Sequence, residues 1–152
     1  MSTMAHATAG AIYQLKVSLC DLSPMIWRRL RLRSDTSSAD LHAIVQIAMG
    51  WEDLHLHLFR IFGKDYGITR FGGISFADDP TCVRLADFQL RVHERFLYVY
   101  DMGDNWQHEV RLECILSPDP RTRYPICTAG AGACPPEDCG GPAGYRAWQA
   151  AR

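Results

Sequence analysis

Three cysteines close together near the C-terminus are the residues with the clearest potential for chemistry. Cys127, Cys134 and Cys139 lie within thirteen residues of one another, in a segment rich in proline. Thiolates bind zinc well, and a structural zinc site needs four ligands. His108 is the expected fourth ligand because it lies on the buried face of a predicted strand, where both ring nitrogens need partners. His57 is the alternative fourth ligand, and zinc is the expected metal.

Two other arrangements explain the same cysteines. The three thiols would pack as small buried hydrophobic groups, with His108 bonded to a carbonyl, or they would form disulfides. The N-terminus has neither the cationic nor the apolar part of a signal peptide, and no apolar run approaches the roughly 20 residues that a membrane span needs. We therefore expect a cytoplasmic protein with reduced thiols and no membrane partner.

One of these cysteines and His108 are also compatible with a catalytic site that has a thiol nucleophile. Cys134 as nucleophile, His108 as base and Asp101 as the orienting carboxylate would make a thiol hydrolase. The chain contains no G-x-S-x-G, P-loop or G-x-G-x-x-G motif. A binding protein is therefore favoured over an enzyme, and no catalytic residue is assigned.

Histidines on predicted strand faces, together with nearby acidic residues, indicate a ligand pocket. His55 and His57 are two residues apart, so both imidazoles would point from one strand face toward a single ion or anion, although core histidines show the same spacing. The expected pocket is lined by His55, His57, Asp101, Asp104, Trp106 and His108.

A third candidate surface combines arginines with one aromatic ring: Trp27, Arg28, Arg29, Arg31 and Arg33. Nucleic-acid surfaces combine cations and aromatic rings in this way, but so do solvated strand faces. The 16 Lys and Arg against 17 Asp and Glu give a net charge of −1. This balance excludes a protein that coats nucleic acid through its overall charge.

Hydrophobic periodicity predicts the elements that position these residues. The 152 residues suit one domain, with a flexible N-terminus over residues 1–10. Alternating patterns predict strands over 11–19, 26–33, 54–62, 95–101 and 106–115. Helical spacing over 41–49, with Ser37 as N-cap and Gly50 as stop, predicts one main helix. We expect an α+β domain with a mostly antiparallel sheet of about five strands and a Pro/Cys-rich loop over 117–142, after which a helix begins near 143.

The predicted hairpin fixes a register. A four-residue turn, Met102-Gly103-Asp104-Asn105, would pair Asp101 with Trp106 and Val99 with His108. Three aromatic residues would then lie on the face opposite His108: Phe96, Tyr98 and Tyr100.

Motifs spread along the chain carry a resemblance. They are Tyr13-Gln14-Leu15-Lys16-Val17, Pro24-Met25-Ile26-Trp27-Arg28-Arg29, Met49-Gly50-Trp51, His55-Leu56-His57-x-Phe59, Tyr98-x-Tyr100-Asp101-x-Gly103-Asp104-x-Trp106-x-His108, Cys134-Pro135-Pro136-Glu137-Asp138-Cys139-Gly140-Gly141 and Gly144-Tyr145. In combination they resemble the plasmid pRiA4b ORF-3-like family, also labelled the IS1096-element passenger TnpR family.

The resemblance implies a small α+β domain carried on plasmids, insertion elements and chromosomes. Similar family members continue beyond the Gly-Tyr pair, so the domain over 11–152 is expected to lack a C-terminal helical extension. The family position of Cys139 also holds apolar residues, which favours His57 as a ligand. The resolvase label rests on genetic context, and this chain has no helix-turn-helix and no serine in a recombinase-like setting.

Together these observations predict a non-enzymatic binding or accessory protein associated with plasmids or insertion elements. It would carry a structural zinc-type site and bind an unidentified protein or small ligand. The first alternative is a nucleic-acid-binding accessory factor of a mobile element. The second is a metal- or thiol-dependent hydrolase.

Overall fold

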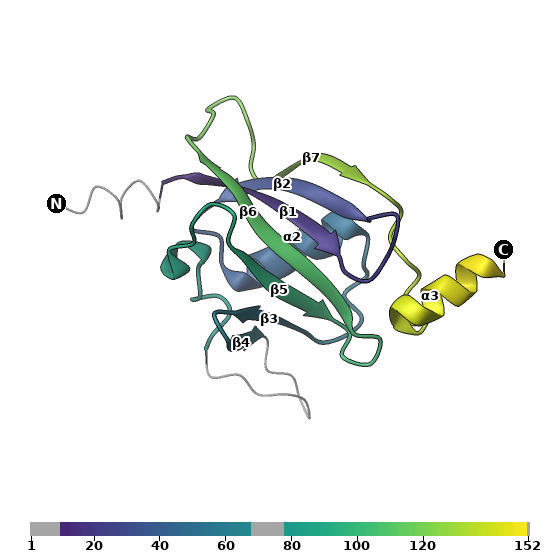
Figure 1. The fold of residues 1–152 in the computed structure, drawn as a ribbon. Coiled ribbons are helices and arrows are strands. Elements are labelled where there is room, and N and C mark those ends of the chain that lie inside the picture. Colours follow the sequence, from purple (N-terminus) through teal and green to yellow (C-terminus); the bar gives the residue numbers. More distant parts are fainter. Residues whose placement is uncertain (1–9, 68–77, 152) are drawn as a thin grey trace.

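The protein folds into one antiparallel sheet with two helices, seen in a computed structural model that describes residues 10–67 and 78–151 (Figure 1). Of the expected flexible N-terminus, residues 1–9 lie outside the described residues. The strand order is β4-β3-β5-β6-β1-β2-β7. The strands are β1 (Ile12–Leu19), β2 (Trp27–Arg33), β3 (His57–Ile61), β4 (Lys64–Gly67), β5 (Arg95–Tyr100), β6 (Trp106–Leu116) and β7 (Ile126–Ala131).

The α+β class is confirmed, but the described residues form seven strands and not five. The additional strand β7 lies in the segment expected to be a loop and pairs with β2 at one edge of the sheet. Prolines flank β7 and do not interrupt it, since Pro125 precedes it and Pro135 follows it. At the other edge, β4 pairs with β3 through a tight turn in which Phe62 and Gly63 have φ of 50° and 78°.

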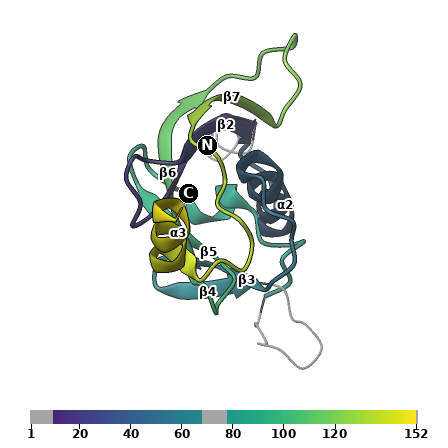
Figure 2. The same ribbon diagram turned by 90° about the vertical axis from the view of Figure 1, so that its right-hand side faces the viewer.

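One face of the sheet is covered by the helix α2 (Ser38–Met49), as Figure 2 shows. The helix begins where predicted, because the Ser37 side chain accepts a hydrogen bond from the Asp40 backbone N–H at 3.1 Å. It ends at Gly50, whose φ of 107° allows its N–H to reach the Gln46 carbonyl. The inward residues of β1, including Tyr13, Leu15 and Val17, complete the core beneath it.

The β5–β6 hairpin has a five-residue turn, so the predicted register was wrong by one residue. Tyr100 pairs with Trp106 and Tyr98 pairs with His108. The extra residue is accommodated because Asp101 adopts a left-handed φ of 63° and its Oδ1 accepts the N–H of Gly103 at 3.1 Å. The three aromatic residues of β5 therefore point into the core on the same face as His108: Phe96, Tyr98 and Tyr100.

Arg28 lies on the helix-covered side of the sheet, apart from the other arginines of β2. Its guanidinium donates to the carbonyls of Ala48 at 2.8 Å, Ala131 at 3.1 Å and Gly132 at 2.9 Å. These contacts satisfy the end of α2 and join it to the end of β7. The structure thus removes Arg28 from the predicted nucleic-acid surface.

The C-terminal helix α3 (Gly141–Ala150) stands at the end of the sheet, and a short 3-10 helix, η1 (Leu85–Phe88), precedes β5. The predicted helix near 143 is thus confirmed. Tyr145 of α3 packs against Trp106, with ring centroids 6.4 Å apart, and Arg146 donates to the Asp21 carbonyl at 2.6 Å. No described helix is long and apolar enough to cross a bilayer.

We predict that Arg28→Met lowers the free energy of unfolding by about 2–4 kcal/mol, because it removes several charge-assisted hydrogen bonds to otherwise unsatisfied carbonyls. Urea denaturation monitored by circular dichroism measures this loss. The control is Arg33→Met, which breaks an exposed ion pair with Asp35 and should change stability by less than about 1 kcal/mol. Equal losses in the two variants would contradict the role of Arg28.

Candidate metal centre

The structure does not bring the predicted zinc ligands together. Cys127 is exposed on the edge strand β7, where its thiol contacts the Ala129 carbonyl at 3.4 Å. Cys134 and Cys139 pack against the core from the segment before α3. Among the described residues, no group of three possible ligand atoms lying within 4.8 Å of one another includes a cysteine. This corrects the ligand set of Cys127, Cys134, Cys139 and His108.

His108 is unsuitable as a ligand because both of its ring nitrogens are occupied. Its Nε2 accepts a hydrogen bond from the Trp51 indole N–H at 3.1 Å, and its Nδ1 lies 3.1 Å from the Tyr98 carbonyl. This geometry requires a neutral ring protonated at Nδ1. Complete burial lowers the pKa of His108 to about 4. The partners expected for this histidine, zinc and a carboxylate, are replaced by an indole and a carbonyl.

His57, the alternative ligand, is buried in the core. Its ring stacks on that of His42, with centroids 3.5 Å apart and planes 7° apart. His42 in turn contacts the Tyr98 hydroxyl at 2.6 Å and Asp53 at 2.8 Å. The two histidines two residues apart, His55 and His57, therefore do not share a ligand.

The hypothetical catalytic triad of Cys134, His108 and Asp101 does not form in the structure either. His108 is bonded to Trp51 and Tyr98, and it forms no close three-membered group with Cys134 and Asp101 among the described residues. Burial, and secondarily the charge of Glu137, raises the pKa of Cys134 to about 12. A thiol with so high a pKa is a poor nucleophile at neutral pH.

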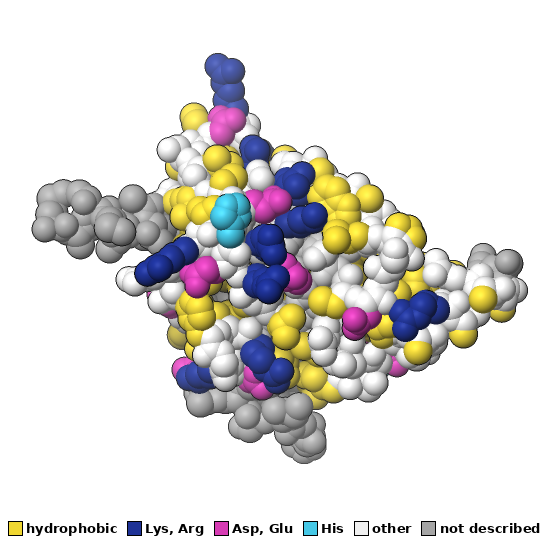
Figure 3. Space-filling model, viewed as in Figure 1, with side chains coloured by type: hydrophobic (Ala, Val, Ile, Leu, Met, Phe, Trp, Pro, Cys, Tyr) yellow, Lys and Arg dark blue, Asp and Glu magenta, His cyan; other side chains and the backbone are white. Residues whose placement is uncertain are grey.

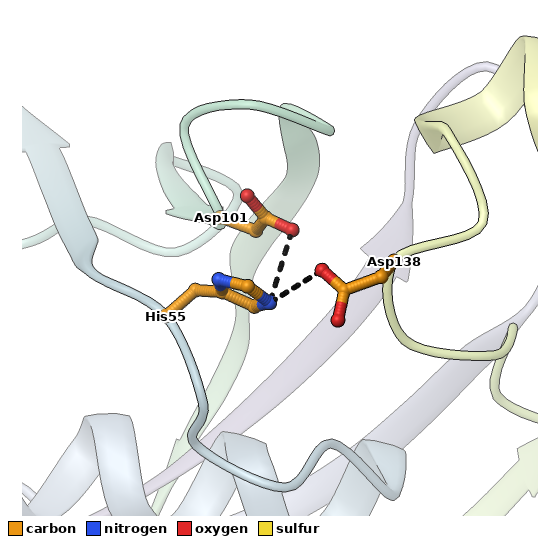
Figure 4. A group of neighbouring side chains, drawn as sticks. All are labelled: His55, Asp101 and Asp138. Carbon is orange, nitrogen blue, oxygen red and sulfur yellow. Dashed lines mark ion pairs between the residues drawn. The ribbon is translucent and has the colours of Figure 1, made fainter.

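A different cluster forms at the end of the sheet, where His55 meets two aspartates (Figure 4). Its Nε2 lies 2.7 Å from Oδ1 of Asp138 and 3.5 Å from Oδ2 of Asp101. Oε1 of Glu137 is 3.9 Å away. The Nε2 atom is buried, yet none of the described residues makes a hydrogen bond of acceptable geometry with it. This nitrogen therefore faces three carboxylates, and when the ring is protonated it forms an ion pair with Asp138.

Three separate segments supply these side chains. His55 precedes β3, Asp101 follows β5 directly, and Asp138 lies in the segment between β7 and α3. Both aspartates have left-handed backbones, with φ of 63° and 56°. A left-handed conformation is uncommon for residues other than glycine and concentrates at sites where side chains must be aimed. Here it directs both carboxylates toward His55 (Figure 4).

Glu137 and Tyr100 connect the cluster to the sheet. The Tyr100 hydroxyl donates to the Glu137 carboxylate at 3.1 Å and accepts the Leu54 backbone N–H at 2.9 Å. The other Glu137 oxygen accepts the Glu52 backbone N–H at 2.8 Å. Burial raises the pKa of Tyr100, so this hydroxyl stays protonated and keeps donating. The segment that carries Asp138 is thereby fixed against the end of β5.

The cluster combines two shielded carboxylates with an exposed one, since the Asp138 side chain is 62% exposed. The side chains of Asp101 and Glu137 are only 9% and 13% exposed. Within the described part of the chain, no lysine or arginine forms an ion pair with these two carboxylates or with Asp138. Buried carboxylates require a cation or a proton for compensation. This requirement distinguishes the cluster from an ordinary acidic surface.

The predicted pocket is thus only partly formed. His55 and Asp101 do converge, whereas Trp106 is fully buried in the core. Asp104 accepts the Gly140 backbone N–H at 3.1 Å and so anchors the C-terminal segment. A side chain at Gly141 would collide with the Asp104 carbonyl oxygen, which explains the glycine there.

Sequence reasoning missed Glu137 and Asp138 as members of this cluster. Both lie within the Cys-Pro-Pro-Glu-Asp-Cys motif, whose thiols indicate zinc more strongly than its acids do. The two adjacent acids in a proline-stiffened segment were the usable signal.

Four members of the predicted basic surface lie together on the open face of the sheet: Trp27, Arg29, Arg31 and Arg33. Arg29 pairs with Glu113 at 2.7 Å, Arg31 donates to Gln14 at 3.0 Å, and Arg33 pairs with Asp35 at 2.9 Å.

Comparison with known proteins agrees with the motifs. The model of the plasmid pRiA4b ORF-3-like protein family matches residues 11–152. The chain belongs to this family. It is 33% identical over 141 residues to an uncharacterized protein, y4hQ, of Sinorhizobium fredii (strain NBRC 101917 / NGR234), covering 90% of this chain and 71% of that protein. It is also similar to the crystal structure of a protein of unknown function, MM3350, from Methanosarcina mazei Go1, with 38% identity and a TM-score of 0.81. That match covers 92% of this chain and 80% of the other.

We predict that acid destabilises the protein through His108. Between pH 6.5 and 4 the unfolded chain binds a proton at this residue while the folded chain does not. The free energy of unfolding therefore falls by about 3 kcal/mol as the pH drops through this window, from this residue alone.

Ring ¹H–¹⁵N NMR of the intact protein should show His108 as the Nδ1–H tautomer, titrating near pH 4. A comparison of urea unfolding at the two pH values with the His108→Gln variant measures the stability change. Titration of the ring near its ordinary pKa would overturn the assignment.

Proposed function

We propose that this family member is a metal-dependent binding module. A divalent cation bound by His55, Asp101 and Asp138 would hold the segment 132–140 against the end of the sheet. The single observation that carries the proposal is the buried Nε2 of His55, which lacks a hydrogen bond and faces three carboxylates. The metal-binding role expected from the sequence is thereby retained, with different ligands.

The geometry of the cluster supports an ion of this kind. The three ligand atoms all lie within 4.8 Å of one another. An ion with bonds of about 2.0–2.2 Å holds neighbouring ligand atoms roughly 3–3.5 Å apart, so the 3.5 Å between Nε2 and Asp101 fits, and the 2.7 Å between Nε2 and Asp138 would widen on binding. Imidazole with carboxylates suits zinc, manganese or iron(II) better than magnesium or calcium. Zinc remains the first candidate.

Three protein ligands would leave at least one coordination position for another molecule. An open position on a first-row ion accepts oxygen or nitrogen donors, so a ligand bearing a carboxylate or phosphate would fit. Glu137 lies beside the ion position and would act as a fourth ligand or as an acceptor for the incoming molecule. This arrangement supports a binding or accessory role over catalysis by the cysteines.

We also propose that the protein works in the cytoplasm, in association with mobile elements. All six cysteines are free thiols, as a reducing cytoplasm would keep them. The plasmid in the family's description supports an accessory role associated with mobile elements.

We predict that the purified protein binds about one zinc or manganese ion per chain, and that His55→Ala and Asp138→Asn each weaken binding at least about tenfold. Isothermal titration calorimetry and elemental analysis measure affinity and stoichiometry. The matched control is Asp65→Asn, which removes a carboxylate paired with Arg60 on the other side of β3 and should leave binding unchanged. Equal binding by Asp138→Asn and Asp65→Asn would refute the site.

We further predict that the metal stabilises the fold. Ion at about 100 times its Kd contributes about 2.7 kcal/mol, which corresponds to a rise in Tm of roughly 5–10 °C for a chain of this size. Differential scanning calorimetry with metal and with a chelator measures the shift. Asp138→Asn should melt at one temperature in both conditions, and a chelator-insensitive wild-type Tm would contradict the clamp.

A further inference from the structure

Four cations form a continuous row across the open face of the sheet. In the strand register, Arg95 of β5 lies opposite Arg111 of β6, Arg111 lies opposite Lys16 of β1, and Lys16 lies opposite Arg29 of β2. Each neighbouring pair is a direct cross-strand pair. Figure 3 shows several Lys and Arg side chains near the centre of the face that α2 leaves uncovered, with Asp and Glu side chains among them.

The row is electrostatically unfavourable by itself. Like charges directly opposite in a sheet repel each other and destabilise the pairing. Glu113 compensates Arg29 at 2.7 Å, and Glu109 lies 3.7 Å from Arg95 and 3.3 Å from Arg111. Lys16 makes no ion pair with the described residues, and the buried Nε of Arg111 has no acceptor among them.

The imbalance is local. Arg31 extends the row on β2, and these five cations with the two glutamates give a net charge of +3 within a chain of net charge −1. A positive surface on an otherwise acidic protein is complementary to a polyanion. The row crosses three interstrand spacings of about 4.8 Å, roughly 14 Å in all.

An aromatic ring lies beside the row. Trp27 is half-buried on the same face, with Lys16 Nζ and the Arg29 guanidinium each 5.0 Å from its ring centroid. Surfaces that bind single-stranded nucleic acid combine a cationic track for phosphates with an aromatic ring on which a base stacks. An acidic protein partner would match the charges but would not use the ring as a stacking surface.

The geometry points to the open face as a binding surface for single-stranded nucleic acid. Phosphates lie along Arg95, Arg111, Lys16 and Arg29, and one base stacks at Trp27. The surface uses none of the residues of the metal cluster, so it stands or fails independently of that site.

Fluorescence anisotropy with a labelled fifteen-nucleotide oligo-dT at several salt concentrations tests this assignment. Neutralising four phosphates predicts a slope of log K against log salt of about −2.8 for a single strand. The double variant Lys16→Gln/Arg111→Gln should bind at least about tenfold more weakly at 50 mM salt, with the slope reduced to about −1.4. Trp27→Leu should weaken binding by at least about fivefold through lost stacking.

The matched control is Arg123→Gln, which removes one positive charge from an exposed loop outside the row and should leave affinity unchanged. Because the double variant relieves repulsion between paired cations, its Tm should not fall below that of the wild type. Three results would overturn the inference: no binding at 50 mM salt, equal loss in the control and the double variant, or tighter binding of a duplex of the same length.

Discussion

Polar contacts hold the segment between β7 and α3 against the sheet, and the proposed site depends on them. The Glu137 carboxylate binds the Glu52 N–H and the Tyr100 hydroxyl, while Asp104 binds the Gly140 N–H. These contacts bring the exposed Asp138 to His55, beside the shielded carboxylates of Asp101 and Glu137. Hydrogen bonds fix where the segment lies, but they do not neutralise its charge. The need for a counter-charge follows from the fold itself.

Much of the fold was predictable because its signals are local. Alternation in β1, β2 and β6 and the caps of α2 at Ser37 and Gly50 depend on neighbours in the sequence, and they were placed correctly. The edge strand β7 was missed because six small or apolar residues without charges resemble a loop when prolines flank them. The hairpin register failed by one residue because the left-handed Asp101 lengthens the turn, and no pattern of hydrophobicity reports that.

Only the two members of the candidate site that adjoin strands of the sheet, His55 and Asp101, were predictable. His55 and Asp101 were identified because they belong to the predicted strand 54–62 and the predicted hairpin, whereas Asp138 reaches them from a segment distant in sequence. His108 was misassigned for a related reason. A buried histidine needs two partners, and sequence cannot reveal that Trp51, in the connection after α2, supplies one of them. Residue type indicated the requirement correctly, but only the tertiary structure shows which group meets it.

The two charged regions lie at opposite ends of β5, since Arg95 begins the strand and Asp101 follows it. With a rise of about 3.3 Å per residue, their backbones are about 20 Å apart. These opposite charges contribute a dipole directed along the strand. Such a dipole turns the protein in the field of any charged body it approaches, so the cationic end leads toward a polyanion and the acidic end faces away. Binding of a cation at the acidic end would reduce this dipole without changing the charges at the cationic end.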